Sequence, residues 1–190
     1  MPSARVSKEE NCGVYFLTIT VKNWYYVLDR YYRWNILANS LKYLKENKNL
    51  KLFNFVFMIN HIHLIVFSED IAGFLRDLKG FTSKEIAKNI QRTEPNLLKI
   101  FTNEKNEFEF WEKTNMPKII ETEKFYFQKA KYIHDNPIKR EYVTEDKNWY
   151  WSSANLDCEL KADDMNDFTF PEINGSGETP EPASQVLEAL

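Results

Sequence analysis

The feature that most constrains the fold is a pair of strand-forming segments separated by only two residues. The segments cover residues 52–58 and 61–67, and both are rich in β-branched and aromatic side chains. The Ile59-Asn60 pair between them has the length of the shortest hairpin connections. The spacing therefore predicts a β-hairpin. Its second strand is largely apolar on both faces, which predicts a central position in a sheet.

Two of the three histidines of the chain, His61 and His63, share one face of that second strand. Residues i and i+2 of a strand project from the same side, with Cα atoms about 6.5–7 Å apart. Both imidazoles can therefore approach one ion or one phosphate. The same pattern also fits two histidines that are simply half-buried at a strand end, so the spacing alone leaves both interpretations open.

A second polar pattern lies near the end of a predicted helix over residues 122–135. Pro137 disfavours helical conformation at the residue before it, so we expect the helix to end there. Tyr132 and Asn136 are four residues apart and share one face, with Cβ atoms about 5–6 Å apart. Taken alone, Tyr132 could equally be a core aromatic residue in a chain with ten tyrosines.

In order and spacing, these segments resemble the single-tyrosine HUH nucleases, and specifically the REP-associated tyrosine transposases. The shared pattern is a strand with histidine, hydrophobe, histidine, followed by a helix with Tyr-Ile-x-x-Asn-Pro. The resemblance covers about residues 13 to 156 and is far more specific than any single motif. Five segments carry it, at residues 14–20, 58–66, 78–83, 110–113 and 149–153.

The resemblance implies an α+β fold, in which a ferredoxin-like antiparallel sheet carries the histidines and the tyrosine helix crosses the same face. It implies Tyr132 as the nucleophile. It also implies His61, His63 and Asn136 as ligands of a divalent cation, Mg²⁺ or Mn²⁺.

The reaction that the resemblance implies is cleavage and transfer of single-stranded DNA, at hairpin-forming repeats. It would proceed through a 5′-phosphotyrosine and a free 3′-hydroxyl. One phosphodiester linkage is exchanged for another, so no nucleotide cofactor is needed.

Two other classes of function stay open at this stage. One is a non-catalytic hairpin-DNA-binding protein, a domesticated transposase. The other is an RNA-directed metal nuclease that uses the histidine pair without the tyrosine, which leaves Tyr132 and Asn136 unexplained. The presence of Tyr132 with all three ligands favours catalysis, and a covalent protein–DNA adduct would separate the classes.

The rest of the chain predicts a strand at residues 14–21 and helices at 31–47 and 71–91, beside the hairpin at 51–67. The helix at 71–91 has polar residues three and four positions apart, which fits a phosphate-facing stripe or an ordinary solvated face. These residues are Arg76, Lys79, Thr82 and Ser83.

Further candidates for DNA contact lie elsewhere. Lys129 and Lys131 are near Tyr132 in sequence and could hold a phosphate, or could be solvated helix charges. Trp24, Tyr25 and Tyr26 follow the first strand and could stack on unpaired bases, although aromatic side chains more often pack in cores.

The net charge of −3 is unevenly distributed. Residues 159–190 contain eight acidic residues and one lysine, a net of −7. Residues 1–158 therefore carry 24 basic and 20 acidic residues, a net of +4. This division predicts one folded domain over residues 1–158, which the resemblance implies is an HUH domain, and an acidic, flexible tail over residues 159–190. We expect the tail to be a solubilising extension rather than a DNA mimic.

Several classes are excluded by what the sequence lacks. No apolar run approaches the length that spans a membrane, and residues 1–8 lack the apolar core of a signal peptide. Cys12 and Cys158 are too far apart for a CxxC-type site and suggest no disulfide framework. We therefore expect a cytoplasmic protein without a membrane partner, and the sequence leaves monomer and homodimer undecided.

Overall fold

The predicted hairpin forms half of a four-stranded antiparallel sheet. In the computed structural model, which describes residues 11–114 and 117–167, β2 (Lys51–Phe57) pairs with β3 (His61–Ser68). β3 then pairs with β1 (Gly13–Thr20), and β1 pairs with the short β4 (Lys118–Ile119), which gives the order β2-β3-β1-β4. β1 and β2 are both antiparallel to the β3 strand between them. This is the split βαβ arrangement of a ferredoxin-like sheet, so the predicted fold class is confirmed.

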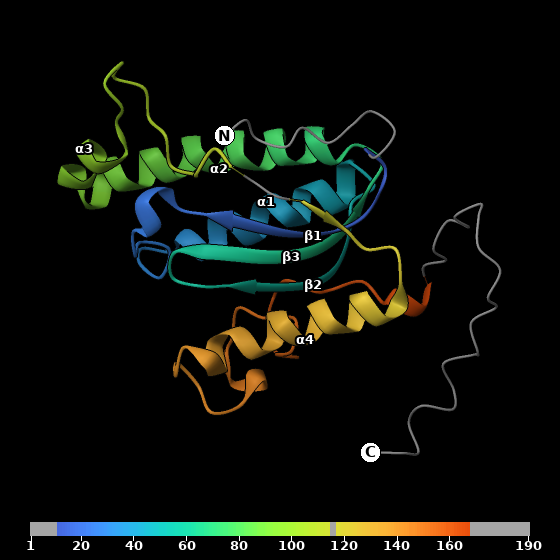
Figure 1. Cartoon of the computed structure of the whole chain (residues 1–190). Helices are drawn as coiled ribbons and strands as arrows, with labels where there is room; N and C mark the ends of the chain where they lie inside the picture. Colours follow the sequence, from blue (N-terminus) through green and yellow to red (C-terminus); the bar gives the residue numbers. More distant parts are fainter. Residues whose placement is uncertain (1–10, 115–116, 168–190) are drawn as a thin grey trace.

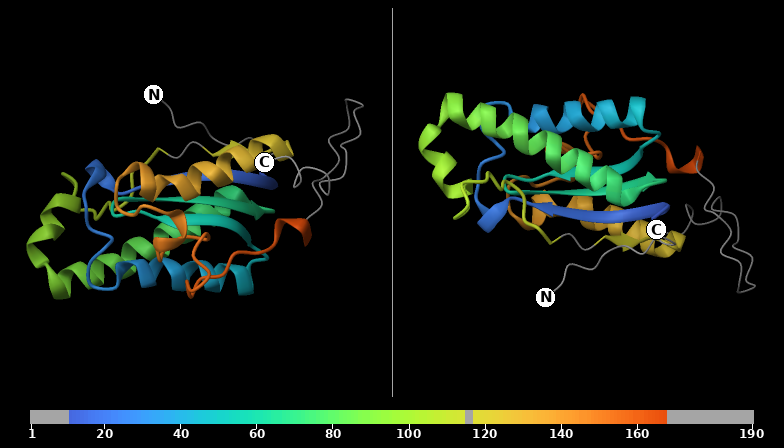
Figure 2. Two further views of the ribbon diagram at one scale, coloured as in Figure 1. Left: turned by 90° about the horizontal axis from the view of Figure 1, so that it is seen from below. Right: turned by 90° about the horizontal axis from the view of Figure 1, so that it is seen from above.

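Helices cover both faces of this sheet. α1 (Arg33–Asn47) and α2 (Ile71–Thr93) pack on one face, and α4 (Glu123–Lys139) crosses the other (Figures 1 and 2). The four-residue α3 (Leu98–Phe101) follows α2. Four short 3₁₀ turns complete the described elements, at Lys22–Trp24, Pro95–Leu97, Asp146–Asn148 and Met165–Asp167.

The alternation of side chains along the strands produces two hydrophobic clusters. On β3, Ile62 and Leu64 join the larger core under α1 and α2, whereas His63 and Ile65 face α4. A bulge in β2 shifts the register between Leu52 and Asn54. α4 therefore packs across the sheet face that carries the histidines, as predicted.

Both ends of the sheet order are extended by short pairings outside the named strands. Phe57 N donates to Trp151 O at 2.8 Å and Ser153 N donates to Phe55 O at 2.9 Å, so residues 151–153 cover the outer edge of β2. Beyond the end of β1, Val21 forms an antiparallel bridge with Trp111. These pairings use strand-edge groups that would otherwise be open to other chains.

The tyrosine helix ends later than the sequence predicted. α4 begins after Thr122, whose hydroxyl caps Phe125 N, and continues through Pro137 to Lys139. The bias of the residue before proline away from helix is a preference. Here it is overridden where Asn136 and Pro137 are buried. The extra turn carries Lys139 to the site described below.

Other boundaries differ by a few residues, as helix ends commonly do. The first helix begins at Arg33 rather than at residue 31, because Tyr31 and Tyr32 have left-handed φ angles of 52° and 61°. The second helix runs to Thr93 rather than to residue 91. The first strand covers Gly13–Thr20, and the two-residue β4 was not predicted.

The predicted domain boundary after residue 158 is wrong. Leu160 is buried in the larger core. The backbone N–H of Asp163 donates to Leu52 O at 2.7 Å, its carboxylate accepts from Leu52 N at 2.7 Å, and it pairs with Lys45 at 3.1 Å. The folded body therefore extends at least to Asp163, because part of the acidic segment lies along the start of β2. Residues 168–190, the remainder of the predicted tail, lie outside the described residues.

The sequence predicted neither a membrane-spanning helix nor a disulfide framework. None of the helices in the described part of the chain combines the length and apolar character needed to cross a membrane. Cys12 is an exposed free thiol and Cys158 a buried one.

Candidate active site

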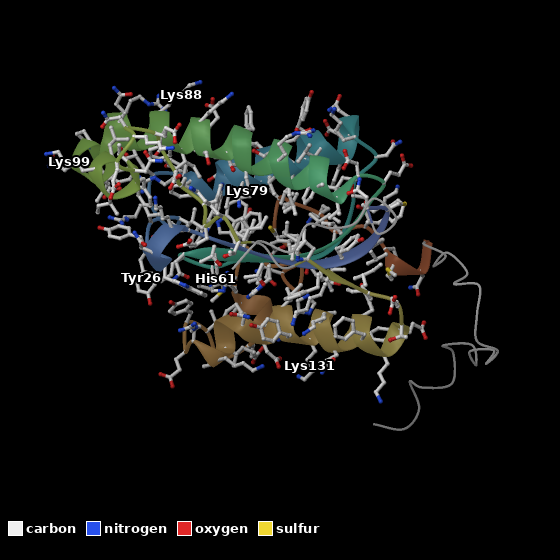
Figure 3. The ribbon with its side chains drawn as sticks, turned by 45° about the horizontal axis from the view of Figure 1, so that its top comes forward. Tyr26, His61, Lys79, Lys88, Lys99 and Lys131 are labelled. Atoms are coloured by element: carbon white, nitrogen blue, oxygen red, sulfur yellow. The ribbon has the colours of Figure 1, made fainter. Side chains whose placement is uncertain are left out.

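The two histidines occupy the start of β3, under the C-terminal half of α4. Their ring centroids lie 4.7 Å apart, and the residues are 4% and 3% exposed. Figure 3 shows His61 at the end of the sheet near the loop that carries Tyr26. The strand alternation seen in the sequence thus becomes a close pair of imidazoles.

The hydrogen bonds around His61 determine which ring nitrogen carries its proton. Asn60 Nδ2 donates to Trp24 O at 3.1 Å, which fixes the orientation of the Asn60 amide. Its Oδ1 then lies 2.7 Å from His61 Nδ1 and accepts a hydrogen bond from it. The Nε2 lone pair is left available, which is the usual arrangement of a metal-binding histidine and its outer partner.

His63 has an equivalent partner on the neighbouring strand. Thr18 Oγ1 lies 2.9 Å from His63 Nδ1, and Thr18 is the register partner of His63 in the β1–β3 pairing. A hydroxyl can accept the Nδ1–H hydrogen bond. The second imidazole can therefore also present Nε2 to the site.

Burial keeps both rings neutral. It lowers the pKa of His61 to about 4, with the positive charge of Arg140 adding to the effect. It lowers the pKa of His63 to about 3, helped by the neighbouring His61. Neutral imidazoles are the form that binds metal, so both side chains are competent ligands at neutral pH.

α4 brings Tyr132 and Asn136 to the same place. Tyr132 is 39% exposed, and its ring centroid lies 5.2 Å from that of His63. Buried Asn136 hydrogen-bonds His61, which opposes the lowering of the His61 pKa by burial, so the Asn136 side chain lies against the imidazole. Phe16 contacts both aromatic rings. Its ring stacks on His63 with 5.5 Å between centroids and meets Tyr132 edge-on with 5.8 Å between centroids.

Two lysines flank the tyrosine. Lys129 Nζ lies 5.6 Å and Lys139 Nζ lies 5.5 Å from the centroid of the Tyr132 ring. The pKa of Lys129 is lowered by burial and by the charge of Lys118. Both flanking lysines favour a phosphate at this position, and Asp135, at 3.5 Å from Lys139 Nζ, partly neutralises the second. Lys131, the other predicted candidate, is exposed and pairs with Asp135 at 3.2 Å.

The donor set fits a divalent cation. Two neutral imidazoles with available Nε2 atoms and one amide oxygen give three protein ligands, which leaves coordination positions for substrate. Within residues 11–114 and 117–167, no group of three or more His, Cys, Asp or Glu side chains could hold a metal ion. The third predicted ligand, Asn136, would supply an amide oxygen instead.

A family model described as "Transposase IS200 like" matches residues 12–136, a segment that includes Tyr132, both histidines and Asn136. The chain belongs to the IS200-like transposase family. No curated protein matches the sequence.

Solved transposase structures share the fold at low sequence identity. A REP-associated tyrosine transposase bound to a REP hairpin is 19% identical with a TM-score of 0.64, and the alignment covers 93% of this chain and all of that one. A protein described as a transposase from Deinococcus radiodurans R1 is 19% identical with a TM-score of 0.42, over 71% of this chain and 97% of that one. The first likeness supports the fold, and the second is too weak to carry an argument.

The predicted stripe on α2 does not form one phosphate-facing surface. Thr82 is fully buried, donates to Leu78 O at 2.6 Å and accepts from Trp111 Nε1 at 2.9 Å. Its assignment to DNA binding is therefore wrong, because the core-facing side of α2 includes this position. Lys79 donates to Glu112 O at 2.6 Å, and burial lowers its pKa to about 8. Arg76 is exposed and pairs with Asp77 at 3.2 Å, and Ser83 is partly exposed.

Sequence reasoning missed the outer partners of the histidines, Thr18 and Asn60. It also missed Phe16, whose ring contacts His63 and Tyr132. A signal for Thr18 was present. Its strand must pair with the histidine strand in any ferredoxin-like sheet, and Thr18 and Thr20 are polar residues in an otherwise apolar run. Lys139 was missed because the helix was expected to end before Pro137.

Proposed function

We propose that this chain is a metal-dependent, single-tyrosine endonuclease and strand transferase that acts on single-stranded DNA at hairpin-forming repeats. One observation carries the proposal. Tyr132, a half-exposed phenol, lies beside two buried, neutral imidazoles whose Nδ1 atoms have outer partners, and a third ligand follows it by four residues. A protein that only binds DNA has no need of this combination.

The proposed reaction exchanges one phosphate ester for another. Tyr132 Oη attacks the phosphorus as its phenolic proton passes to solvent, and the P–O3′ bond breaks. The departing 3′-oxygen takes up a proton, so the products are a 5′-phosphotyrosine and a free 3′-hydroxyl. An incoming 3′-hydroxyl reverses these events and joins a new strand. Lys129 and Lys139 favour the negative charge that develops on the phenol and phosphate.

His61 Nε2, His63 Nε2 and the Asn136 side-chain oxygen would hold Mg²⁺ or Mn²⁺. When bound, the cation supplies Lewis-acid polarisation of a phosphoryl oxygen. All three ligands are neutral, so they leave the full charge of the ion for this task. Phe16 restricts the position of both His63 and Tyr132 through ring contacts.

The proposed substrate rests on family membership and on one solved relative. The IS200-like family match supports transposition chemistry on DNA, and the similar REP-associated transposase is bound to a REP hairpin. A DNA hairpin with an unpaired flank is therefore the first substrate to test.

The decisive experiment uses a labelled hairpin with a single-stranded flank, purified protein and Mn²⁺, with covalent adducts resolved on a denaturing gel. We expect adduct from the unmodified protein and none from Tyr132→Phe, which lacks only the attacking oxygen. Tyr126→Phe is the matched control. Tyr126 lies on the same helix but is buried against Phe53, and burial raises its pKa to about 12.

The outcomes separate the classes of function. An adduct that persists in Tyr132→Phe would move the nucleophile elsewhere. Tight binding by the unmodified protein with no adduct in Mg²⁺ or Mn²⁺ would favour a hairpin-binding protein without catalysis.

A further inference from the structure

A group of exposed aromatic rings adjoins the histidine pair. Trp24 and Tyr26, in the loop between β1 and α1, are 54% and 57% exposed. The Trp24 ring meets the His61 ring at 5.7 Å between centroids. Figure 3 shows Tyr26 and His61 at the same end of the molecule. Large exposed aromatic side chains beside a polar site indicate a binding surface.

The backbone that presents Trp24 is held in an unfavourable conformation. Asn23 and Trp24 both have φ angles of 56°, which is uncommon for any residue and costly for a bulky one. Three hydrogen bonds maintain it. Asn23 N donates to Glu112 Oε1 at 2.7 Å, Trp24 N donates to Val21 O at 2.9 Å, and Trp24 O accepts from Asn60 Nδ2 at 3.1 Å. Asn60 also binds His61, so one side chain positions both the exposed indole and the metal ligand.

The residues that follow α4 add a third ring and a cation. Tyr142 stacks on Trp149 at 5.4 Å and remains partly exposed. Burial and the charge of Tyr26 raise the pKa of Tyr142, and the charge of Arg140 partly offsets this rise. Arg140 also acts on His61. Arg140 is exposed at the C-terminal end of α4, four residues after Asn136, and Tyr142 N donates to Pro137 O at 3.0 Å, so both residues lie at the end of the helix that carries the site.

We propose that Trp24, Tyr26 and Tyr142 form an aromatic platform on which unpaired bases of the DNA strand stack next to the reacting phosphate. Arg140 would contact the backbone of the same strand. The inference rests on the proposed function for the position of that phosphate. Every base has a π-face, so stacking on aromatic rings beside a cationic group suits a single strand of any sequence. A folded duplex keeps its bases stacked on one another and offers no such faces.

The test measures binding in EDTA, where cleavage is not required, by fluorescence anisotropy of a labelled hairpin with a single-stranded flank. Stacking on one aromatic side chain is worth about 1–3 kcal/mol per base, which corresponds to about 5- to 150-fold in Kd. We expect losses in this range for Trp24→Ala and Tyr26→Ala. Trp24→Tyr, which keeps a stacking ring, should bind within about threefold of the unmodified protein.

Two controls isolate stacking from other effects. Tyr43→Ala removes an equally exposed ring from α1, on the other face of the sheet, and should leave binding unchanged. A hairpin whose flank is abasic should bind the unmodified protein, Trp24→Ala and Tyr26→Ala alike, because it has no bases to stack. Thermal unfolding identifies any variant that fails to fold. If Trp24→Ala fails to fold, the binding of Tyr26→Ala tests the proposal.

The proposal is overturned if Tyr26→Ala and Trp24→Ala bind the normal flank as the unmodified protein does, or if the losses are the same on the abasic flank. The second result would indicate a backbone or protein contact instead. Failure of the proposed function would look different. Binding would depend on the platform, and the unmodified protein would form no adduct when Mn²⁺ is added.

Discussion

Asn60 is the residue whose replacement most directly tests the construction of the proposed metal site. Its Oδ1 accepts from His61 Nδ1 at 2.7 Å, and its Nδ2 donates to Trp24 O at 3.1 Å. Asn60→Ala removes both bonds, whereas Asn60→Asp keeps an acceptor for His61 and loses only the donor to Trp24. The two variants therefore separate the support of the ligand from the support of the loop.

The expected loss for Asn60→Ala follows from the burial of His61, which is 4% exposed. A buried donor left without a partner costs about 1–3 kcal/mol, or the ring must place its proton on Nε2 and lose the metal-binding lone pair. Loss of the outer partner of a metal-binding histidine commonly lowers metal affinity by about 10- to 100-fold, or about 1.4–2.7 kcal/mol. The two ranges agree, so we expect Mn²⁺ binding to weaken by this factor.

Asn60→Asp should behave differently. Its carboxylate still accepts from His61 Nδ1 and raises the His61 pKa above the present value of about 4. We therefore expect Mn²⁺ affinity within a few-fold of the unmodified protein. Isothermal titration calorimetry with Mn²⁺ near pH 7.5, where both histidines are neutral, measures both variants. Unchanged affinity in Asn60→Ala would refute the role given to this side chain, and equal losses in both variants would assign the effect to the Trp24 loop.

Three further predictions concern the ligands, the pH dependence of stability and the chain terminus. His61→Ala and His63→Ala should each abolish adduct formation, and Asn136→Ala should weaken it. Excess EDTA should have the same effect as the histidine variants, and full cleavage in EDTA would defeat the metal assignment. Both histidines have folded-state pKa values, about 4 and 3, below the unfolded value of about 6.5, so the unfolded chain binds more protons as pH falls. Metal-free protein should therefore lose stability from about pH 6.5 downward, by about 2 kcal/mol per histidine at pH 5 relative to pH 8. Urea titrations at several pH values measure this loss, and an unchanged pH dependence of stability in His61→Gln and His63→Gln would contradict it. Truncation after Asp167 removes four acidic and no basic residues, which changes the net charge from −3 to +1 and should tighten DNA binding at low salt. Truncation after Cys158 also removes the buried Leu160 and should lower the melting temperature.

Several parts of the fold and site could be predicted because they depend on neighbours in the chain. The alternation of residues 61–67 requires both histidines to share a face, and helical periodicity requires the same of Tyr132 and Asn136. The two-residue gap before His61 specifies the hairpin. These are short-range geometric consequences, so the order of residues along the chain determines which side chains share a face. The roles of ligand and nucleophile came from the family resemblance.

Packing between distant segments decided the rest. Thr82 has the spacing of a surface residue, but it is buried and hydrogen-bonded by Trp111. Leu160 lies in an acidic segment, but it packs into the larger core, and Asp163 beyond it bonds to the start of β2. α4 continues past Pro137 where the buried face of the helix outweighs a local bias against it. The sequence alone determined which residues share a face. Only the tertiary structure decided which faces meet, because burial and the orientation of hydrogen-bond partners such as Asn60 arise from contacts that the local pattern does not contain.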